Sequence, residues 1–226
     1  MLAATHLLQP EKHRAWPRAD LQGLIDHVTA GGAFITAAMT GHHRTAATFE
    51  FASVVAVDVD YGLILEEFAG HPLADSPCFV YSTPFYDPEN GQHRFRVLFR
   101  LPELVTSGEL YKAIATILTH ALGGDRSCTD PTRLFYGNSK AAHISIDLDA
   151  VLDEQIITDA EAFLEQQRAA CRDAASEVDE VSILRAIHVL EQDVIKPTKD
   201  GERDKFVRIS AAARDGGDAL FPAWSD

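Results

Sequence analysis

The chain has 226 residues, of which 46% are hydrophobic and 24% are charged. These values are ordinary for a globular protein and exclude a largely disordered one, and the length suits one large domain with a small one. Neither a membrane span of roughly 20 apolar residues nor a secretory signal is present, so we expect a cytoplasmic protein. The three cysteines are far apart, which argues against a disulfide framework and a zinc site.

The net charge of −14 argues against a generic nucleic-acid coat, because phosphate binding depends mainly on lysine and arginine. The charge is unevenly distributed, however. Residues 94–140 contain seven basic and four acidic side chains, whereas residues 151–226 contain nine basic and seventeen acidic ones. A locally basic segment in an acidic protein suits a bound triphosphate or one short piece of template.

Residues 1–47 are predicted to be a helical lead-in to the domain. Asp20 is a possible helix cap, and Gly31-Gly32 marks the end of the helix. Between them, apolar residues recur at helical spacing, at Leu21, Leu24, Ile25 and Val28.

Three strands are predicted next, over residues 51–59, 79–83 and 93–100. The second and third flank a turn-rich loop over residues 84–92, so we expect them to form a hairpin. Alternation in the third strand puts Arg94, Arg96 and Leu98 on one face. The opposite face then carries Phe95, Val97 and Phe99.

A helix is predicted over residues 106–122, where Thr106 and Glu109 have the spacing of a capping box. Short strands are predicted over residues 134–137 and 142–147. Strands mixed with helices indicate an α+β fold, with an antiparallel or mixed sheet flanked by helices.

Another capping box, Thr158 with Glu161, predicts a helix that runs to about residue 175. We divide the chain into a core over residues 1–175 and a small helical domain over residues 176–226, with further helices near residues 183–190 and 206–213. The tryptophan near the end of the sequence suggests that the natural protein continues.

Asp58 and Asp60 follow an apolar strand segment, VVAVDVD. Residues two apart in a strand point to the same side, so these carboxylates converge. Mg²⁺ and Mn²⁺ prefer such oxygen ligands and share them with substrate phosphates. The alternative is a strand end that carries two solvated acids.

Basic residues accompany these acids. Arg94 and Arg96 have guanidinium forks that match phosphate oxygens, although they could instead form the solvated face of an edge strand. Residues 123–140 contain Asp125, a third candidate metal ligand, followed by Arg133 and Lys140 as candidate phosphate ligands. The alternative for this segment is a polar loop.

The order of these clusters resembles the archaeo-eukaryotic primase superfamily, in particular the primase-polymerases of phages and plasmids. The match covers about residues 50–147. VVAVDVD looks like the acidic first motif of that family, and LGGDRSCTDPTRLFYGNSK looks like the third, with Asp125 as metal ligand and Arg133 as nucleotide-binding arginine. Lys140 is similar to a lysine in related enzymes.

The second family motif, which contains a histidine, is not matched. HRFRVLF lies at its place with Arg94 and Arg96 on the corresponding face. Either the arginines replace the histidine as triphosphate ligands, or His93 or Tyr86 substitutes for it.

The resemblance implies an RRM-like catalytic core that joins nucleotides on a DNA template. Asp58, Asp60 and Asp125 would hold two Mg²⁺ or Mn²⁺ ions. The expected partners are primed or single-stranded DNA and dNTPs or NTPs, with a helicase possible in the same polypeptide and no membrane. Alternatives are a metal-dependent nuclease or other nucleotidyltransferase with the same acids, or a non-catalytic nucleic-acid-binding module. Alanine in place of any one aspartate is expected to abolish extension without unfolding the domain.

Overall fold

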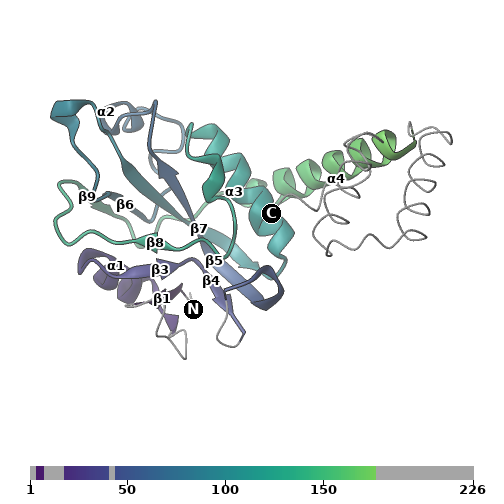
Figure 1. Cartoon of the computed structure of the whole chain (residues 1–226), viewed down its shortest axis with the longest axis horizontal. Helices are drawn as coiled ribbons and strands as arrows, with labels where there is room; N and C mark the ends of the chain where they lie inside the picture. The colour runs from purple at the N-terminus through teal and green to yellow at the C-terminus, as the bar shows by residue number, and fades with distance from the viewer. Residues whose placement is uncertain (1–3, 8–17, 41–43, 177–226) are drawn as a thin grey trace, which may run out of the picture. The chain divides into compact units, whose positions relative to one another are not determined.

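The computed structural model describes residues 4–7, 18–40 and 44–176 (Figure 1). The chain divides into a unit of Met1–Leu164 and a unit of Glu165–Asp226. The helices predicted near residues 183–190 and 206–213 lie outside the described residues. The predicted division at residue 175 therefore stays a prediction.

A five-stranded antiparallel sheet forms the centre of the first unit. Its strand order is β4 (Ala37–Met39), β5 (Phe49–Val59), β7 (Phe95–Val105), β6 (Phe79–Ser82) and β9 (Ile144–Ile146). Every neighbouring pair is antiparallel, and β6 and β7 form the predicted hairpin. With helices packed against the sheet, this arrangement confirms the predicted α+β fold class.

A second, four-stranded sheet was not expected from the sequence. Its strand order is β2 (Arg18–Ala19), β1 (Ala4–Leu7), β3 (Ala33–Ile35) and β8 (Phe135–Tyr136). The predicted helix is present as α1 (Leu21–Thr29), with the Asp20 carboxylate accepting a hydrogen bond from the Gly23 N–H. Residues 1–47 were predicted as a helical lead-in, but strands β1 to β4 lie there beside α1. The short apolar run that forms β3 and β4 has no periodicity that distinguishes strand from helix.

One face of the large sheet is covered by α3 (Gly108–Ala121), which packs against β5 and β7 (Figure 1). Ser107, rather than the predicted Thr106, caps this helix, because its hydroxyl accepts a hydrogen bond from the Leu110 N–H. The short helix α2 (Leu65–Phe68) and the first turns of α4 (Gln155–Ser176) complete this apolar layer. The helix predicted from Thr158 thus begins three residues earlier.

The other face of the sheet packs against α1, together with Phe34 and Phe135 of the small sheet. The sheet residues of this layer are Val54, Ala56, Phe79, Tyr81 and Leu98. The predicted alternation is therefore confirmed, since Leu98 faces this layer while Phe95, Val97 and Phe99 face α3.

Three short 3₁₀ helices complete the described fold: Ala46–Thr48, Pro88–Asn90 and Arg126–Cys128. Among the described residues, no helix has the length and apolar character needed to cross a bilayer.

Candidate active site

Polar residues replace apolar ones at the same level on three neighbouring strands of the large sheet. Asp58 of β5 lies directly opposite Arg96 of β7, and Arg96 lies opposite Tyr81 of β6. The preceding level of the same face is apolar, with Ala56 opposite Leu98 and Leu98 opposite Phe79. The strand register alone therefore brings an acid, an arginine and a tyrosine together on one face.

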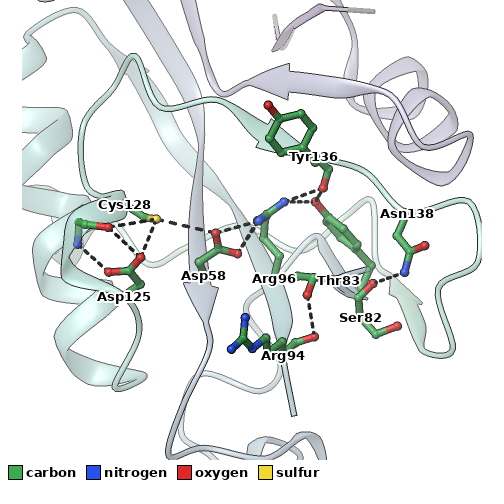
Figure 2. Close-up of polar contacts among 11 residues, drawn as sticks. Asp58, Ser82, Thr83, Arg94, Arg96, Asp125, Cys128, Tyr136 and Asn138 are labelled. Carbon is green, nitrogen blue, oxygen red and sulfur yellow. Dashed lines mark hydrogen bonds and ion pairs between the residues drawn. The ribbon is translucent and has the colours of Figure 1, made fainter. Parts of the chain in front are cut away.

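Arg96 uses most of its hydrogen-bonding capacity inside the protein (Figure 2). Its Nε and Nη2 donate to the two carboxylate oxygens of Asp58 at 2.7 and 2.8 Å. Its Nη1 donates to the Tyr81 hydroxyl at 2.6 Å and to the Tyr136 carbonyl at 2.7 Å. The guanidinium also lies 4.7 Å from the centre of the Phe135 ring. A guanidinium has five N–H groups, and these hydrogen bonds engage four of those of Arg96.

This pair is buried, with Asp58 9% exposed and Arg96 6% exposed. A buried carboxylate without a partner is strongly unfavourable, so Arg96 is the counterion that lets Asp58 lie here. The role differs from the predicted phosphate ligand, because a guanidinium with four donors engaged has little left for a substrate. The structure also changes the expectation for Asp58→Ala, which would leave the Arg96 charge buried and unpaired.

The loop after α3 brings Asp125 to Asp58. Beyond its pairing with β4, the outer edge of β5 is open, and the Asp125 N–H donates to the Asp58 carbonyl there at 2.8 Å. Gly124 makes this approach possible, since a Cβ at that position would lie 2.6 Å from the Asp58 carbonyl oxygen. The close approach of the loop to the strand therefore explains the second glycine of the GGD sequence, because a side chain at that position would clash with β5.

The Asp125 carboxylate is held by its own turn (Figure 2). Its Oδ1 accepts from the Ser127 N–H at 2.9 Å and its Oδ2 from the Ser127 hydroxyl at 2.8 Å. Burial acts to raise the pKa of Asp125, but these hydrogen bonds, the Cys128 thiol and the charge of Arg133 outweigh it, so the pKa is lowered. Asp125 is therefore ionised at neutral pH.

Cys128 links the two acids, a contact that the sequence did not reveal. Its Sγ lies 3.2 Å from Asp125 Oδ2 and 3.8 Å from Asp58 Oδ2. Burial raises the thiol pKa to about 12, and the adjacent carboxylates add to the rise. Cys128 is thus a neutral thiol whose single S–H, a weak donor, is shared between the two acids, with the shorter contact to Asp125.

Asp60 lies close enough to the other two acids for their charges to act on its pKa. Burial raises its pKa, and the charges of Asp58 and Asp125 raise it further, while Arg94 and Arg96 act in the opposite direction. Asp58 and Asp125 therefore both lie close enough to repel the Asp60 carboxylate. Repelling carboxylates near basic side chains are typical of functional sites.

The other predicted ligands differ in their distance from the acids. Arg94 is half-buried and acts on Asp60, and Arg133 is exposed and acts on Asp125. Lys140 is exposed on the loop after β8, where its backbone N–H donates to Asn138. That loop is fixed to the large sheet, because the Asn138 side chain donates to the Ser82 carbonyl.

Tyr86 and His93 lie elsewhere. Tyr86 packs against the apolar layer around α3, and its ring meets the His93 ring edge-on at 6.1 Å. Their placement favours Arg94 over either residue as the replacement for the histidine of the second motif, since Arg96 is already engaged with Asp58.

The donor types fit a divalent cation, since three neighbouring carboxylates supply the oxygen ligands that Mg²⁺ and Mn²⁺ prefer. Their orientations do not yet form a metal cage. Within the described part of the chain, no three acidic, histidine or cysteine side chains are grouped to hold a metal ion. Both oxygens of Asp58 face Arg96, and both oxygens of Asp125 face Ser127.

The VapE N-terminal domain family matches residues 18–175, more than half of the chain. The chain belongs to this family. The match leaves out β1 but contains every other strand of the two sheets, α1 to α3 and nearly all of α4. The candidate site therefore lies entirely within it. No curated protein matches the chain.

Three solved structures are similar in fold. The AEP domain of the cyanophage S-2L primase-polymerase is 11% identical with a TM-score of 0.45, over 70% of this chain and 88% of that one. The catalytic domain of primase RepB′ in complex with initiator DNA is 13% identical with a TM-score of 0.43, over 74% and 89%. Another structure of primase RepB′ is 15% identical with a TM-score of 0.45, over 95% and 76%.

The resemblance predicted from the sequence is confirmed at the level of the family, whose match contains residues 50–147. At such low identities and TM-scores, the likeness to these structures says nothing of the activity of this chain.

Proposed function

We propose that this domain catalyses template-directed nucleotidyl transfer, as a primase, a DNA polymerase or both, in the replication of a mobile element. The observation that carries the proposal is the convergence of Asp58 and Asp125, whose carboxylates both contact the same thiol and whose charges both act on Asp60. Arg94 and Arg133 lie beside these acids and can neutralise phosphate charge. Acids that bind cations next to arginines that bind phosphates are what this reaction requires.

Asp58, Asp60 and Asp125 would hold two Mg²⁺ or Mn²⁺ ions. When bound, such ions activate the attacking 3′-hydroxyl and stabilise the leaving pyrophosphate. Arg96 orients Asp58 through its paired hydrogen bonds, and Ser127 orients Asp125. Metal binding then requires at least one of these carboxylates to turn from its present partner.

Phosphate binding by the nucleotide falls to Arg133, with Lys140 as a further ligand on the loop after β8. Arg94, beside Asp60, would contact a phosphate of the nucleotide or of the DNA strand. Arg133 is exposed, and its charge already acts on Asp125, so a phosphate bound there would lie next to the acids. The proposed substrates are dNTPs or NTPs, with primed or single-stranded DNA as template. A helicase in the same natural polypeptide remains part of the proposal.

A second candidate is a non-catalytic nucleic-acid-binding module. The observation that favours it is the closed Asp58–Arg96 pair, which neutralises one of the three acids inside the protein. Such a module would bind DNA without extending or cutting it.

Primer extension on a primed single-stranded template tests the proposal. The eight nucleotides are supplied separately with Mg²⁺ or Mn²⁺, and product lengths are read on a denaturing gel. Longer products support nucleotidyl transfer, and shorter products indicate a nuclease that uses the same acids. DNA binding without any change of length by the folded chain supports the binding module.

A further inference from the structure

Two exposed aromatic rings flank Arg94 beside the acidic site. Tyr61 is 70% exposed and Phe85 is 71% exposed. The Arg94 Cζ lies 5.5 Å from the centre of the Tyr61 ring and 5.9 Å from the centre of the Phe85 ring. Large aromatic side chains usually lie inside a protein, so two exposed rings around one cation indicate a binding surface.

Short turns hold both rings in place at the ends of strands. Tyr61 follows β5 in a tight turn that Gly62 allows with a φ of 86°, where the Leu63 N–H donates to the Tyr61 carbonyl. Phe85 follows β6 in a turn closed by the Tyr86 N–H and the Thr83 carbonyl. Pro84, before Phe85, suits the second position of such a turn. The sheet therefore fixes the positions from which both rings project.

Arg94 is held between them by the hairpin. The Thr83 N–H donates to the Arg94 carbonyl at 2.9 Å, and the Arg94 Nε donates to the Gln92 side chain at 3.2 Å. Its two terminal amino groups have no hydrogen-bond acceptor among the described residues. They are thus available to an anion that approaches between the rings.

We propose that Tyr61, Arg94 and Phe85 form a binding site for single-stranded DNA. Two neighbouring bases stack on the two rings, and the phosphate that joins them meets Arg94. Sites for single strands combine basic side chains that follow the backbone with aromatic rings on which successive bases stack. Two rings around one cation match a dinucleotide step, whereas a free nucleotide has only one base to stack.

The overall charge makes stacking decisive at this site. At a net charge of −14, the protein as a whole repels a polyanion, so general attraction does not supply the affinity. Arg94 also lies close enough to Asp60 for its charge to oppose the rise in the pKa of that acid. The inference rests on the proposed function, because it places the bound strand next to the acids that would carry out nucleotidyl transfer.

Fluorescence anisotropy of a labelled oligo-dT tests the site, with the full chain and no added metal. Tyr61→Ala and Phe85→Ala are each expected to weaken binding about tenfold, the effect of losing one stacked base. Tyr61→Phe keeps the ring and should retain wild-type affinity. Leu104→Ala removes another exposed apolar side chain, 52% exposed at the far end of β7, and should leave binding unchanged.

Salt dependence separates the cation from the rings. Arg94→Met removes one phosphate contact, so the slope of log affinity against log salt concentration should become shallower by about 0.7. The two alanine variants should keep the wild-type slope, because stacking releases no counterions. A change of slope in the alanine variants, with none in Arg94→Met, contradicts the assigned roles.

Unchanged oligonucleotide affinity in both alanine variants overturns the site, as does an equal loss in Leu104→Ala. Weaker binding of free dTTP in these variants, with oligo-dT affinity intact, also overturns it, because the rings would then serve a nucleotide. The assay involves no extension. If DNA affinity depends on the rings but the chain never extends DNA, only the proposed function is refuted. If the chain extends DNA but its DNA affinity does not depend on the rings, only this site is refuted.

Discussion

The two faces of the five-stranded sheet come from the same strands but differ in where apolar side chains give way to polar ones. Toward α3, β5 and β7 are apolar along their paired length, as in Val57, Val59 and Phe95. Toward α1, apolar residues give way to Asp58, Arg96 and Tyr81, which lie side by side. One face supplies the apolar core, and the other changes from core to polar site within one level of the sheet.

This difference shows how the site gains a fixed geometry. Arg96 is held by strand pairing on both sides, so its guanidinium reaches Asp58 without a flexible loop. Arg94, two residues earlier on the same side, lies at the sheet end and contacts exposed rings. Two arginines of one sequence pattern thus differ in role, because one lies inside the sheet and the other at its end.

The largest effect is expected from breaking the buried pair. Asp58→Ala should destabilise the fold by about 3–5 kcal/mol, because Arg96 is then buried without its counterion. Thermal unfolding of Asp58→Ala, Arg96→Met and the double variant measures this. We expect the double variant to be more stable than the sum of the two losses predicts. Additive losses would mean that the two residues do not act as a pair.

A smaller effect is expected at the loop that crosses the edge of β5. Gly124→Ala should cost about 1–3 kcal/mol, because the added methyl group would lie 2.6 Å from the Asp58 carbonyl oxygen. Extension activity should fall as well, since Asp125 would be displaced. Gly70→Ala is the matched control, as its added methyl group would meet ordinary contact at 3.6 Å. Equal melting temperatures for the two variants would contradict this role of Gly124.

The two remaining basic residues should differ in nucleotide binding. Arg133→Met should weaken nucleotide binding about tenfold through a lost charge-assisted hydrogen bond, because Arg133 lies next to Asp125. Lys140→Met should change it by no more than about fivefold, the range of an exposed ion pair. Titration of nucleotide with Mn²⁺ into each variant measures the difference. A larger loss for Lys140→Met would move the phosphate site toward the loop after β8.

The smallest effect concerns thiol reactivity. Cys171 is exposed on α4, whereas Cys78 and Cys128 are buried and have pKa values raised to about 12 by burial. Cys171 should therefore react quickly with a maleimide in the folded protein, whereas Cys78 and Cys128 should react only when the fold opens. Peptide mapping by mass spectrometry identifies them. Rapid labelling of Cys128 would show that the acidic site opens more readily than the core.

The sequence predicted the elements whose periodicity is strong. The β6–β7 hairpin, α3 and the approximate extent of α4 follow from alternation, helical spacing and caps, and β5 follows from its short Val-rich run. The small sheet was missed because two- to four-residue strands carry no period, and their pairing depends on distant segments. β8, for example, was predicted as a strand, but its pairing with β3 was not.

The site was predicted in its residues more than in its contacts. Asp58, Asp60 and Asp125 were identified from strand parity and local composition, and the structure places them together. The pairing of Asp58 with Arg96 depends on the register between β5 and β7, which a local pattern does not contain. Tyr81 was read only as a strand residue and Cys128 only as an unpaired cysteine, because their contacts come from other elements.

The most direct test of the central claim is primer extension by Asp60→Asn beside the wild-type chain. Asp60→Asn changes one oxygen to nitrogen and leaves the Asp58–Arg96 pair intact, and Asp75→Asn is an exposed control of the same chemistry. We expect extension to fall by at least about a hundredfold in Asp60→Asn, with unchanged melting temperature, and to persist in Asp75→Asn. Wild-type extension by a folded Asp60→Asn variant would contradict a role for these acids in nucleotidyl transfer.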